Sequence, residues 1–313
     1  MPIISTHSLT RTFRKTRAVD GLTLDIEAGE LFGLVGPDGA GKTTTLRLLA
    51  GLLDITEGEA RVLEYDLKSQ SEAVKKHIGY MAQRFSLYGE LSVDENLQFF
   101  AEIFDVPPHV RRERSERLLA FAGLTEFRDR RAAKLSGGMQ KKLALACTLI
   151  HQPEILLLDE PTTGVDPIAR REFWNILTEL HLQGTTIIVS TPYMDEADRC
   201  SRVGLMYAGK LVACAPPRAI RASLNAEVVE IHAADWRAAR EIVVTLPGVR
   251  EVQTYGEALH ALVDDAARRE KDIARALKKH KLAVQSIRST TPRMEEAFIS
   301  IIRQIEAESE TTA

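Results

Sequence analysis

The chain has 313 residues, which is enough for two ordinary domains. An apolar fraction of 44% is typical of a globular protein with a sizeable core, and a net charge of −3 argues against a nucleic-acid partner, since such binders carry a global basic field. The three cysteines, Cys147, Cys200 and Cys214, are widely spaced and indicate neither a disulfide framework nor a zinc site. We therefore expect reduced thiols, as in the cytosol.

The first 20 residues lack the apolar segment of a signal peptide. No apolar run approaches the ~20 residues that a membrane-spanning helix needs. If the protein acts at a membrane, we expect another chain to supply the membrane-spanning part.

The first half of the chain alternates between strand and helix patterns. Residues 22–26 alternate polar and apolar side chains, which predicts a half-buried strand, and residues 31–36 form an apolar run typical of a strand buried on both faces. Helical patterns and further apolar runs then follow in turn at 43–53, 139–151, 156–158, 168–182 and 185–190. This alternation predicts an α/β fold with a parallel sheet.

The segment Gly36–Thr43 matches the phosphate-binding pattern G-x-x-x-x-G-K-[ST]. It follows a predicted buried strand and opens a predicted helix, where backbone N–H groups and the helix N-terminus favour an anion. A glycine-rich turn without function is the alternative, and the match of all eight residues between a predicted strand and a predicted helix disfavours it. Lys42 is expected to reach the β- and γ-phosphates of a nucleotide, and the hydroxyl of Thr43 to ligate Mg²⁺. The predicted nucleotide-binding residues of the loop are Gly36, Pro37, Asp38, Gly39, Ala40, Gly41, Lys42 and Thr43.

Residues 92–130 have a different pattern. Apolar side chains recur there at helical spacing, and Pro107-Pro108 interrupts them. We interpret the region, about 84–152, as a helical subdomain inserted between strands of the sheet.

The motif Leu135–Gln140 reads Leu-Ser-Gly-Gly-Met-Gln. Ser136 is a candidate N-cap, and Gly137 and Gly138 allow a close backbone approach at the start of the next predicted helix. The motif therefore predicts a second anion-binding helix start; a simple capped helix is the alternative.

Asp159 and Glu160 follow the apolar run 155–158, at the carboxyl end of a predicted buried strand. Ligands bind at this end of open α/β sheets. One carboxylate can support Mg²⁺ and the other can orient or deprotonate water. An acidic strand end that merely meets solvent is the alternative, and the nearby phosphate loop disfavours it.

A domain boundary is expected near Ala215-Pro216-Pro217, which gives domains at 1–220 and 221–313. The second domain shows the order β-α-β-β-α-β of a ferredoxin-like unit, followed by a last helix over 292–305. Its predicted elements are 227–232, 235–246, 249–255, 258–263, 266–280 and 283–289. No motif for chemistry lies in this domain. A ferredoxin-like unit could bind a small regulator or aid dimerisation, and dimerisation is its expected role.

The three motifs, in this order, strongly resemble those of the ATP-binding subunits of ABC transporters, over about residues 3–220. The resemblance is strongest to bacterial export ATPases that act with ABC-2-type permeases, drug-resistance efflux ATPases among them, and residues 292–298 resemble the end of that group's accessory domain. It implies a dimeric P-loop ATPase at the cytoplasmic face of a membrane, with ATP and Mg²⁺. A soluble ABC ATPase acting on ribosomes or DNA is the alternative, but such chains usually carry two cassettes or long coiled-coil insertions.

The resemblance also assigns residues by position. Phe13 matches the aromatic that stacks on adenine, although a core aromatic is an equally good interpretation. Gln83 matches the glutamine that senses Mg²⁺ and the γ-phosphate and faces the permease; Phe85 and Tyr88 beside it are expected at that partner surface or in the core.

The remaining assignments concern phosphates and the dimer. Thr44 is implied to contact phosphates and Mg²⁺ beside Lys42 and Thr43. Ser136 and Gly138 are implied to contact the γ-phosphate that the opposite subunit holds, and Asp166 matches the D-loop between subunits. The resemblance also implies that Asp159 supports Mg²⁺ and that Glu160 is the catalytic base.

Three positions depart from the family pattern. Asp38 stands where Asn is usual, and we expect it to point outward; Cys147 replaces a common Arg, and we expect a small buried residue. Pro192, in the switch region 190–198, occupies the position of the switch histidine. Proline has neither a side-chain donor nor a backbone N–H, so it can neither bond the γ-phosphate nor orient Glu160.

Pro192 leaves the subunit arrangement open. In a homodimer both composite sites would lack the switch histidine. In a heterodimer this chain would contribute one impaired site, and its intact 135–140 motif would complete the competent site of a second ATPase. A subunit that binds ATP without cleaving it is a further alternative.

Overall fold

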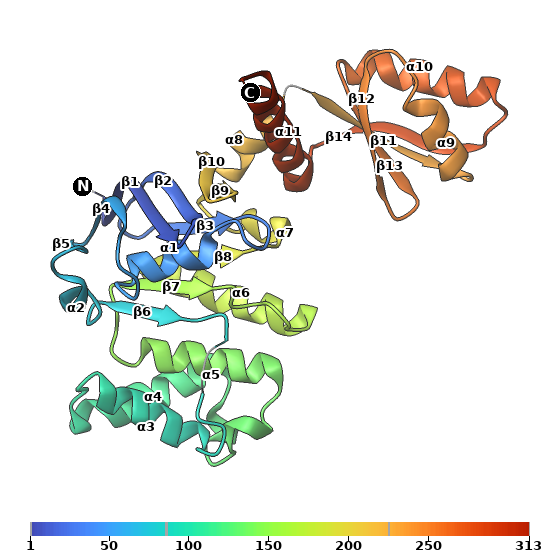
Figure 1. The fold of residues 1–313 in the computed structure, drawn as a ribbon. Coiled ribbons are helices and arrows are strands. Elements are labelled where there is room, and N and C mark those ends of the chain that lie inside the picture. The colour runs from blue at the N-terminus through green and yellow to red at the C-terminus, as the bar shows by residue number, and fades with distance from the viewer. Residues whose placement is uncertain (1, 85–86, 225, 313) are drawn as a thin grey trace. The chain divides into compact units, whose positions relative to one another are not determined.

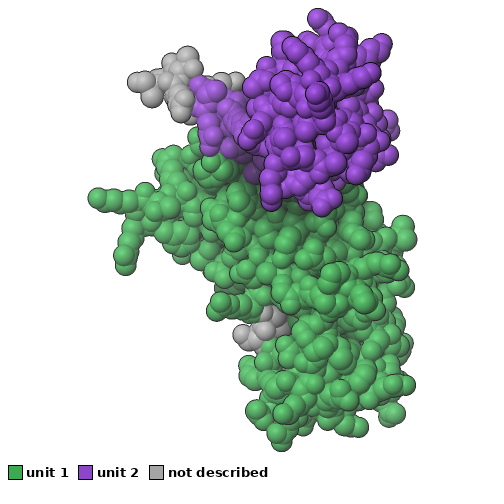
Figure 2. Space-filling view, turned by 90° about the vertical axis from the view of Figure 1, so that its right-hand side faces the viewer, with its two compact units in different colours: residues 1–217 green, residues 218–313 purple. Residues whose placement is uncertain are grey.

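The computed structural model describes residues 2–84, 87–224 and 226–312. The chain divides into two compact units, residues 1–217 and 218–313 (Figure 2). Each unit has a hydrophobic core of its own. Within the described residues, no helix combines the length and apolar character that crossing a membrane requires.

A six-stranded sheet forms the centre of the first unit. In spatial order it contains β10 (Lys210–Ala215), β9 (Arg202–Tyr207), β3 (Leu31–Val35), β8 (Thr186–Thr191), β7 (Ile155–Asp159) and β6 (Ile78–Met81). All its neighbours run parallel except β10, which pairs antiparallel with β9. Every residue of β3, β7 and β8 is buried, which accounts for their continuous apolar sequences. The predicted parallel α/β sheet is confirmed.

A second, antiparallel sheet packs in the same unit. Its strands, in spatial order, are β2 (Thr16–Ile26), β1 (Ile4–Phe13), β4 (Glu57–Val62) and β5 (Tyr65–Asp66). β2 begins earlier than the predicted 22, because a tight turn pairs Phe13 with Thr16. Five helices accompany the two sheets or follow them at the unit boundary: α1 (Lys42–Leu49), α2 (Ser71–Val74), α6 (Pro167–Leu182), α7 (Met194–Ala197) and α8 (Pro217–Ala222).

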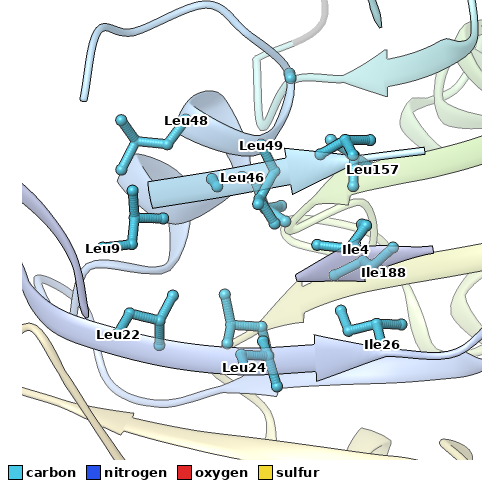
Figure 3. Close-up of a cluster of buried hydrophobic side chains, with 14 of the residues drawn as sticks. Ile4, Leu9, Leu22, Leu24, Ile26, Leu46, Leu48, Leu49, Leu157 and Ile188 are labelled. Carbon is cyan, nitrogen blue, oxygen red and sulfur yellow. The ribbon is translucent and has the colours of Figure 1, made fainter. Parts of the chain in front are cut away.

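The core of this unit lies around α1. Figure 3 shows Leu46 and Leu49 of α1 gathered with Ile4 of β1, Leu24 of β2 and Leu157 of β7. All of these side chains are buried. The cluster fixes α1 against both sheets, and it thereby fixes the loop that precedes α1.

Three helices lie together beyond β6 in Figure 1, and they contact one another. They are α3 (Val93–Ile103), α4 (Pro108–Ala122) and α5 (Gly137–Leu149), with short 3-10 turns η1 (Thr125–Phe127) and η2 (Ala132–Lys134) between the last two. Ser92 and Glu95 form a capping box at the start of α3. Pro108 occupies the first turn of α4, where a missing N–H costs nothing, so the two prolines separate α3 from α4.

The second unit has one antiparallel sheet with the order β12 (Val249–Tyr255), β13 (Ala258–Val263), β11 (Glu227–Ala233) and β14 (Val284–Thr290). Its helices are α9 (Trp236–Val243), α10 (Ala266–Lys279) and α11 (Met294–Thr312). This strand order is that of the ferredoxin-like fold, and the predicted fold class is confirmed. The predicted end of the last helix at 305 is wrong, because the following Glu and Ala residues favour helix and α11 continues to Thr312.

A buried polar cluster joins α11 to the sheet. His260 of β13 is 1% exposed; its Nδ1 lies 2.6 Å from Oε1 of Glu296, and its Nε2 lies 3.3 Å from Oε2 of Glu230. Arg288 of β14 donates to Oε1 of Glu230 at 2.7 Å. Hydrogen bonds from Arg288 are the main cause that lowers the pKa of Glu230 from its usual value to about 2.

Candidate functional site

The loop Gly36–Thr43 joins β3 to α1, at the carboxyl end of the parallel strands. Gly41 precedes α1 with φ +102°, a left-handed conformation. A Cβ on Gly41 would lie 2.3 Å from the carbonyl oxygen of Ala18, so no other residue fits this position. The first backbone N–H groups of α1, which have no partner within the helix, follow this glycine directly.

Lys42 is 3% exposed, and its ammonium is shared between the loop and an acid. Nζ donates to the carbonyl oxygens of Gly36 at 2.9 Å and Pro37 at 3.0 Å. It also lies 3.3 Å from Oε1 of Glu160. A buried cation needs such partners, and the same ammonium is positioned to serve an anion that enters the loop.

Asp159 is fully buried at the end of β7. Its Oδ1 accepts hydrogen bonds from Oγ1 of Thr43 at 2.9 Å and from Oγ of Ser190 at 2.7 Å. Its Oδ2 has no hydrogen-bond partner within the described residues. Since leaving a buried carboxylate oxygen unpaired is costly, the site fits a hard cation that takes oxygen ligands from Asp159 and Thr43.

Glu160 has a strained backbone. Its φ is +46°, which an L-residue adopts at a cost of about 1–3 kcal/mol. The backbone N–H donates to the carbonyl oxygen and to Oγ of Ser190, at 3.1 and 3.0 Å. On the carboxylate, Oε2 accepts from Nε2 of Gln83 at 2.7 Å and lies 3.4 Å from Oγ1 of Thr163. The surroundings therefore hold this carboxylate in one orientation.

Gln83 follows β6, and its backbone also has a partner. Nζ of Lys141, on α5, donates to the carbonyl oxygen of Gln83 at 2.9 Å. Burial lowers the pKa of Lys141, while the charges of Asp159 and Glu160 oppose the shift. Lys141, Thr163 and Ser190 were not among the predicted site residues. No local pattern marks them, because each meets the site only through the fold.

Four of these side chains, Lys42, Thr43, Gln83 and Glu160, line one cavity of about 770 Å³, a size suited to a nucleotide-sized ligand. Its walls are formed by Phe13, Ala18, Asp38, Gly39, Gly41, Lys42, Thr43, Thr44, Gln83, Glu160, Thr163, Pro192 and Tyr193. Gly36, Ala40 and Asp159 are buried behind this lining, and Pro37 is exposed beside it.

Two predictions about this cavity can be examined directly. Phe13 is 40% exposed, and the Arg11 guanidinium lies 4.7 Å from its ring centroid, so the core interpretation of Phe13 is wrong. Asp38 is exposed and also forms part of the cavity wall, so the expectation that it points outward stays a prediction. Pro192 contributes an apolar ring to the wall and no hydrogen-bond donor.

The motif 135–140 stands apart from this cavity. Ser136 caps α5 by accepting a hydrogen bond from Met139 N–H at 3.3 Å, and both Ser136 and Gly137 are exposed. Gly138 is buried: a Cβ there would lie 2.5 Å from Cβ of Ala169 on α6. None of the three lines the 770 Å³ cavity.

Asp166 directly precedes α6. It caps α6 by accepting hydrogen bonds at Oδ1 from the N–H groups of Ile168 and Ala169, at 3.0 and 2.9 Å. Asp166 and Ile168 are both exposed. The close packing of Gly138 on Ala169 thus ties the exposed start of α5 to the exposed start of α6.

The loop that carries Pro192 is fixed by a buried acid. Glu196 is 1% exposed and accepts hydrogen bonds from Oγ1 of Thr162 at 2.8 Å and Oγ1 of Thr191 at 2.6 Å. Nε of Arg170 lies 3.7 Å from Oε1 of Glu196, and the guanidinium stacks 4.1 Å from the ring centroid of Tyr193. The loop therefore keeps a defined position without a histidine.

Two other predictions concern side chains outside the cavity. Tyr88 is 49% exposed and packs edge-on against Phe99, with ring centroids 4.4 Å apart, whereas Phe85 lies outside the described residues. Cys147 is fully buried, as expected, and burial raises the pKa of its thiol.

Comparison with known proteins relates this geometry to function. A family model described as ABC transporter matches residues 19–163. The chain is 34% identical over 303 residues to the daunorubicin/doxorubicin resistance ATP-binding protein DrrA of Streptomyces peucetius, covering 95% of this chain and 92% of that one. It is 37% identical over 249 residues to the Nod factor export ATP-binding protein I of Burkholderia thailandensis, covering 79% and 81%.

A longer relative matches part of this chain. The probable multidrug ABC transporter ATP-binding protein YbhF of Escherichia coli is 44% identical over 220 residues, which is 70% of this chain and 38% of YbhF. The chain therefore spans less than half the length of that relative.

Solved structures share the fold. The ATP-binding cassette MJ0796, in a dimeric post-hydrolysis state bound to ADP and Pi, matches with a TM-score of 0.63 and 26% identity, covering 68% of this chain and 98% of that one. The cbiO1 protein of Clostridium perfringens, part of the complex cbiONQ, matches with a TM-score of 0.66 and 26% identity, covering 79% and 96%.

Proposed function

Because the chain belongs to the ABC transporter family of ATP-binding proteins, we propose that it binds and hydrolyses ATP as the nucleotide-binding subunit of a bacterial exporter. The observation that carries this proposal is the gathering of Lys42, Thr43, Gln83 and Glu160 around one 770 Å³ cavity, with Asp159 directly behind it. The relatives named for drug resistance and for Nod factor export support the direction of transport. The exporting permease is proposed to be of the ABC-2 type.

Each side chain has a role that its surroundings support. Glu160 is the general base: the strained backbone and the hydrogen bond from Gln83 aim its carboxylate, and water is the group that it deprotonates. Lys42 exchanges its contacts with Gly36, Pro37 and Glu160 for phosphate oxygens.

Mg²⁺ is the cation that we propose for the oxygen ligands of Thr43 and Asp159, with Gln83 beside them. When bound, it neutralises charge on the β- and γ-phosphates. The unpaired Oδ2 of Asp159 supports this assignment. Thr44 and the loop N–H groups hold phosphate oxygens, and the exposed ring of Phe13 stacks on the adenine.

We propose that the working unit is a dimer. The motif at the start of α5 does not line the cavity of its own chain, and its Ser136 and Gly137 are exposed, so this helix start is free to meet the nucleotide of a partner chain, with the buried Gly138 directly after them. Asp166 lies beside them at the same exposed edge. In this arrangement the chain is peripheral, at the cytoplasmic face of the membrane.

The permease and the second domain complete the proposal. The half-exposed ring of Tyr88, close in sequence to Gln83, is a candidate contact for the permease. We propose 1–220 as the nucleotide-binding domain and 221–313 as an accessory domain that aids dimerisation. Deletion of residues 221–313 should weaken the dimer in sedimentation velocity, and an unchanged dimer would remove that role.

Pro192 favours a second candidate: a subunit that binds ATP but needs another ATPase chain for turnover. The ring of Pro192 lines the cavity where a donor is expected from the family pattern, and it has none. Pairing the Glu160→Gln variant of this chain with the second ATPase chain tests this candidate. Heterodimers that retain near-normal turnover support it, and complete loss of turnover argues against it.

The deciding experiment measures Mg-ATP turnover and ATP binding by the wild type, Glu160→Gln and Pro192→His. We expect Glu160→Gln to bind ATP and to lose about 10²–10³-fold in turnover. ATP binding without wild-type turnover, restored by Pro192→His, would identify a site disabled by the proline. A wild-type chain that binds no ATP would refute the proposed function.

A further inference from the structure

One side chain connects the 135–140 motif with the catalytic carboxylate. Lys141 lies in α5, the helix that the motif opens, and its Nζ donates to the carbonyl oxygen of Gln83 at 2.9 Å. The side chain of the same Gln83 donates to Oε2 of Glu160 at 2.7 Å. Two hydrogen bonds therefore lead from α5 to Glu160.

The two hydrogen bonds between α5 and Glu160 lie beside a second cavity. This cavity has a volume of about 390 Å³ and is lined by Gln83, Lys141, Gly137, Thr163 and Val165 among others. Because the elements around this space are not closely packed against each other, a polar link can transmit movement where side-chain packing would not. Lys141 and Gln83 both line this space, and the hydrogen bond between them links α5 to the segment after β6.

The two ends of α5 have different surroundings. Ser136 and Gly137 at its start are exposed, whereas its second half is buried, with Leu143 to Thr148 all below one tenth exposure. A ligand that contacts the exposed start would therefore act on the part of α5 that the buried core does not hold. Lys141 lies about one turn from that start, between the two parts.

We propose that Lys141 is a positioning residue that makes the Glu160 of one chain respond to nucleotide held against its own α5 by the partner. The inference deepens the proposed function and rests on it. An ammonium donating to a carbonyl oxygen forms a charge-assisted hydrogen bond, which is stronger than a neutral one. Arginine can also make such a bond, and methionine cannot.

The next residue supplies a matched control. Lys142 carries the same charge on the same helix, but its ammonium pairs with Glu172 of α6 and does not line either cavity. A general effect of removing a lysine from α5 would appear in both variants. An effect through Gln83 would appear only at Lys141.

The experiment compares Lys141→Met, Lys141→Arg and Lys142→Met in the full chain. Turnover is measured as a function of ATP concentration. The affinity for ATP is measured with a fluorescent ATP analogue, and dimerisation is measured by sedimentation of variants that also carry Glu160→Gln. If the wild type does not hydrolyse ATP, the three substitutions are compared in chains that also carry Pro192→His.

We expect Lys141→Met to lower kcat about tenfold and to bring the Hill coefficient toward 1, with ATP affinity and dimerisation unchanged. Lys141→Arg should recover the parental kcat and Hill coefficient, and Lys142→Met should have the same kcat and Hill coefficient as the parent. The proposal is overturned if Lys141→Met keeps the parental kcat and Hill coefficient, if Arg fails to rescue, or if Lys142→Met has the same effect. ATP binding without turnover in either background, or no ATP binding, would instead contradict the proposed function.

Discussion

The hydroxyl of Ser190 donates to Oδ1 of Asp159 at 2.7 Å, across the parallel strands β8 and β7. Oγ of Ser190 also accepts a hydrogen bond from the backbone N–H of Glu160, at 3.0 Å. One fully buried serine therefore positions two adjacent acids: it fixes the carboxylate of the first and the backbone of the second.

Ser190→Ala should lower turnover about tenfold and the free energy of unfolding by about 1–3 kcal/mol, because it leaves a buried oxygen and a buried N–H with one partner fewer. Phosphate release and urea unfolding measure the two effects. Thr186→Val on the same strand is the control, since Thr186 is buried but its hydroxyl bonds Gly29 N–H, away from the acids. Equal turnover in the two variants would contradict the role given to Ser190.

The cluster around Glu196 gives a second prediction. Glu196→Ala should lower the free energy of unfolding by about 3–5 kcal/mol, because it leaves the hydroxyls of Thr162 and Thr191 and the Arg170 guanidinium without their buried partner. Urea unfolding checks the size of the loss.

Arg170→Met serves as the matched variant for that cluster. Arg170 is about one quarter exposed and lies 3.7 Å from Glu196, so its removal should cost less than the removal of Glu196. A loss for Arg170→Met as large as that for Glu196→Ala would show that the ion pair, and not the two threonine hydrogen bonds, holds the Pro192 loop.

The pKa of Glu230 predicts a pH dependence in the second unit. In the folded chain this pKa is lowered from 4.5 to about 2, so the ionised Glu230 stabilises the fold above pH 4.5, and this contribution decreases as the pH falls from 4.5 toward 2. Urea unfolding of the wild type and of Arg288→Leu should differ at pH 7, and the difference should shrink between pH 4.5 and 3. A difference that stays constant over this range would exclude the Arg288–Glu230 pair as its source.

A fourth prediction concerns why residue 138 is glycine. Gly138→Ala should destabilise the chain by about 1–3 kcal/mol, because the new Cβ would lie 2.5 Å from Cβ of Ala169. Gly137→Ala is the control, since a Cβ there meets only the carbonyl oxygen of Gly164, at 3.9 Å. Thermal unfolding measures both, and Ala169→Gly should partly rescue Gly138→Ala. No rescue would mean that the glycine does not serve helix packing.

Much of the site could be predicted because each of its parts is a short motif of consecutive residues. The apolar runs before Gly36 and before Asp159 identify strands buried on both faces, and parallel strands bring their carboxyl ends to the same edge of a sheet. Lys42 and Glu160 therefore meet although they are far apart in the chain. In the second unit, the predicted order of strands and helices was likewise enough to predict the ferredoxin-like fold.

The rest depends on side-chain directions that no local pattern encodes. Ser190 ends an apolar run like any strand residue, and only its register with Asp159 makes it part of the site. Lys141 follows the 135–140 motif as an ordinary helix lysine, and its partner, Gln83, lies on a separate segment. Phe13 could not be assigned to core or surface, because its exposure depends on the turn that β1 and β2 make.

The left-handed backbone of Glu160 has a consequence for engineering. Glycine or asparagine at position 160 would adopt φ +46° more readily than glutamate and so relax the fold, while removing the proposed base. The same replacement would also leave the buried ammonium of Lys42 and the amide of Gln83 without their carboxylate partner. Residue 160 is therefore a position where relief of backbone strain and loss of a buried ion pair oppose each other, so a variant that restores one of them gives up the other.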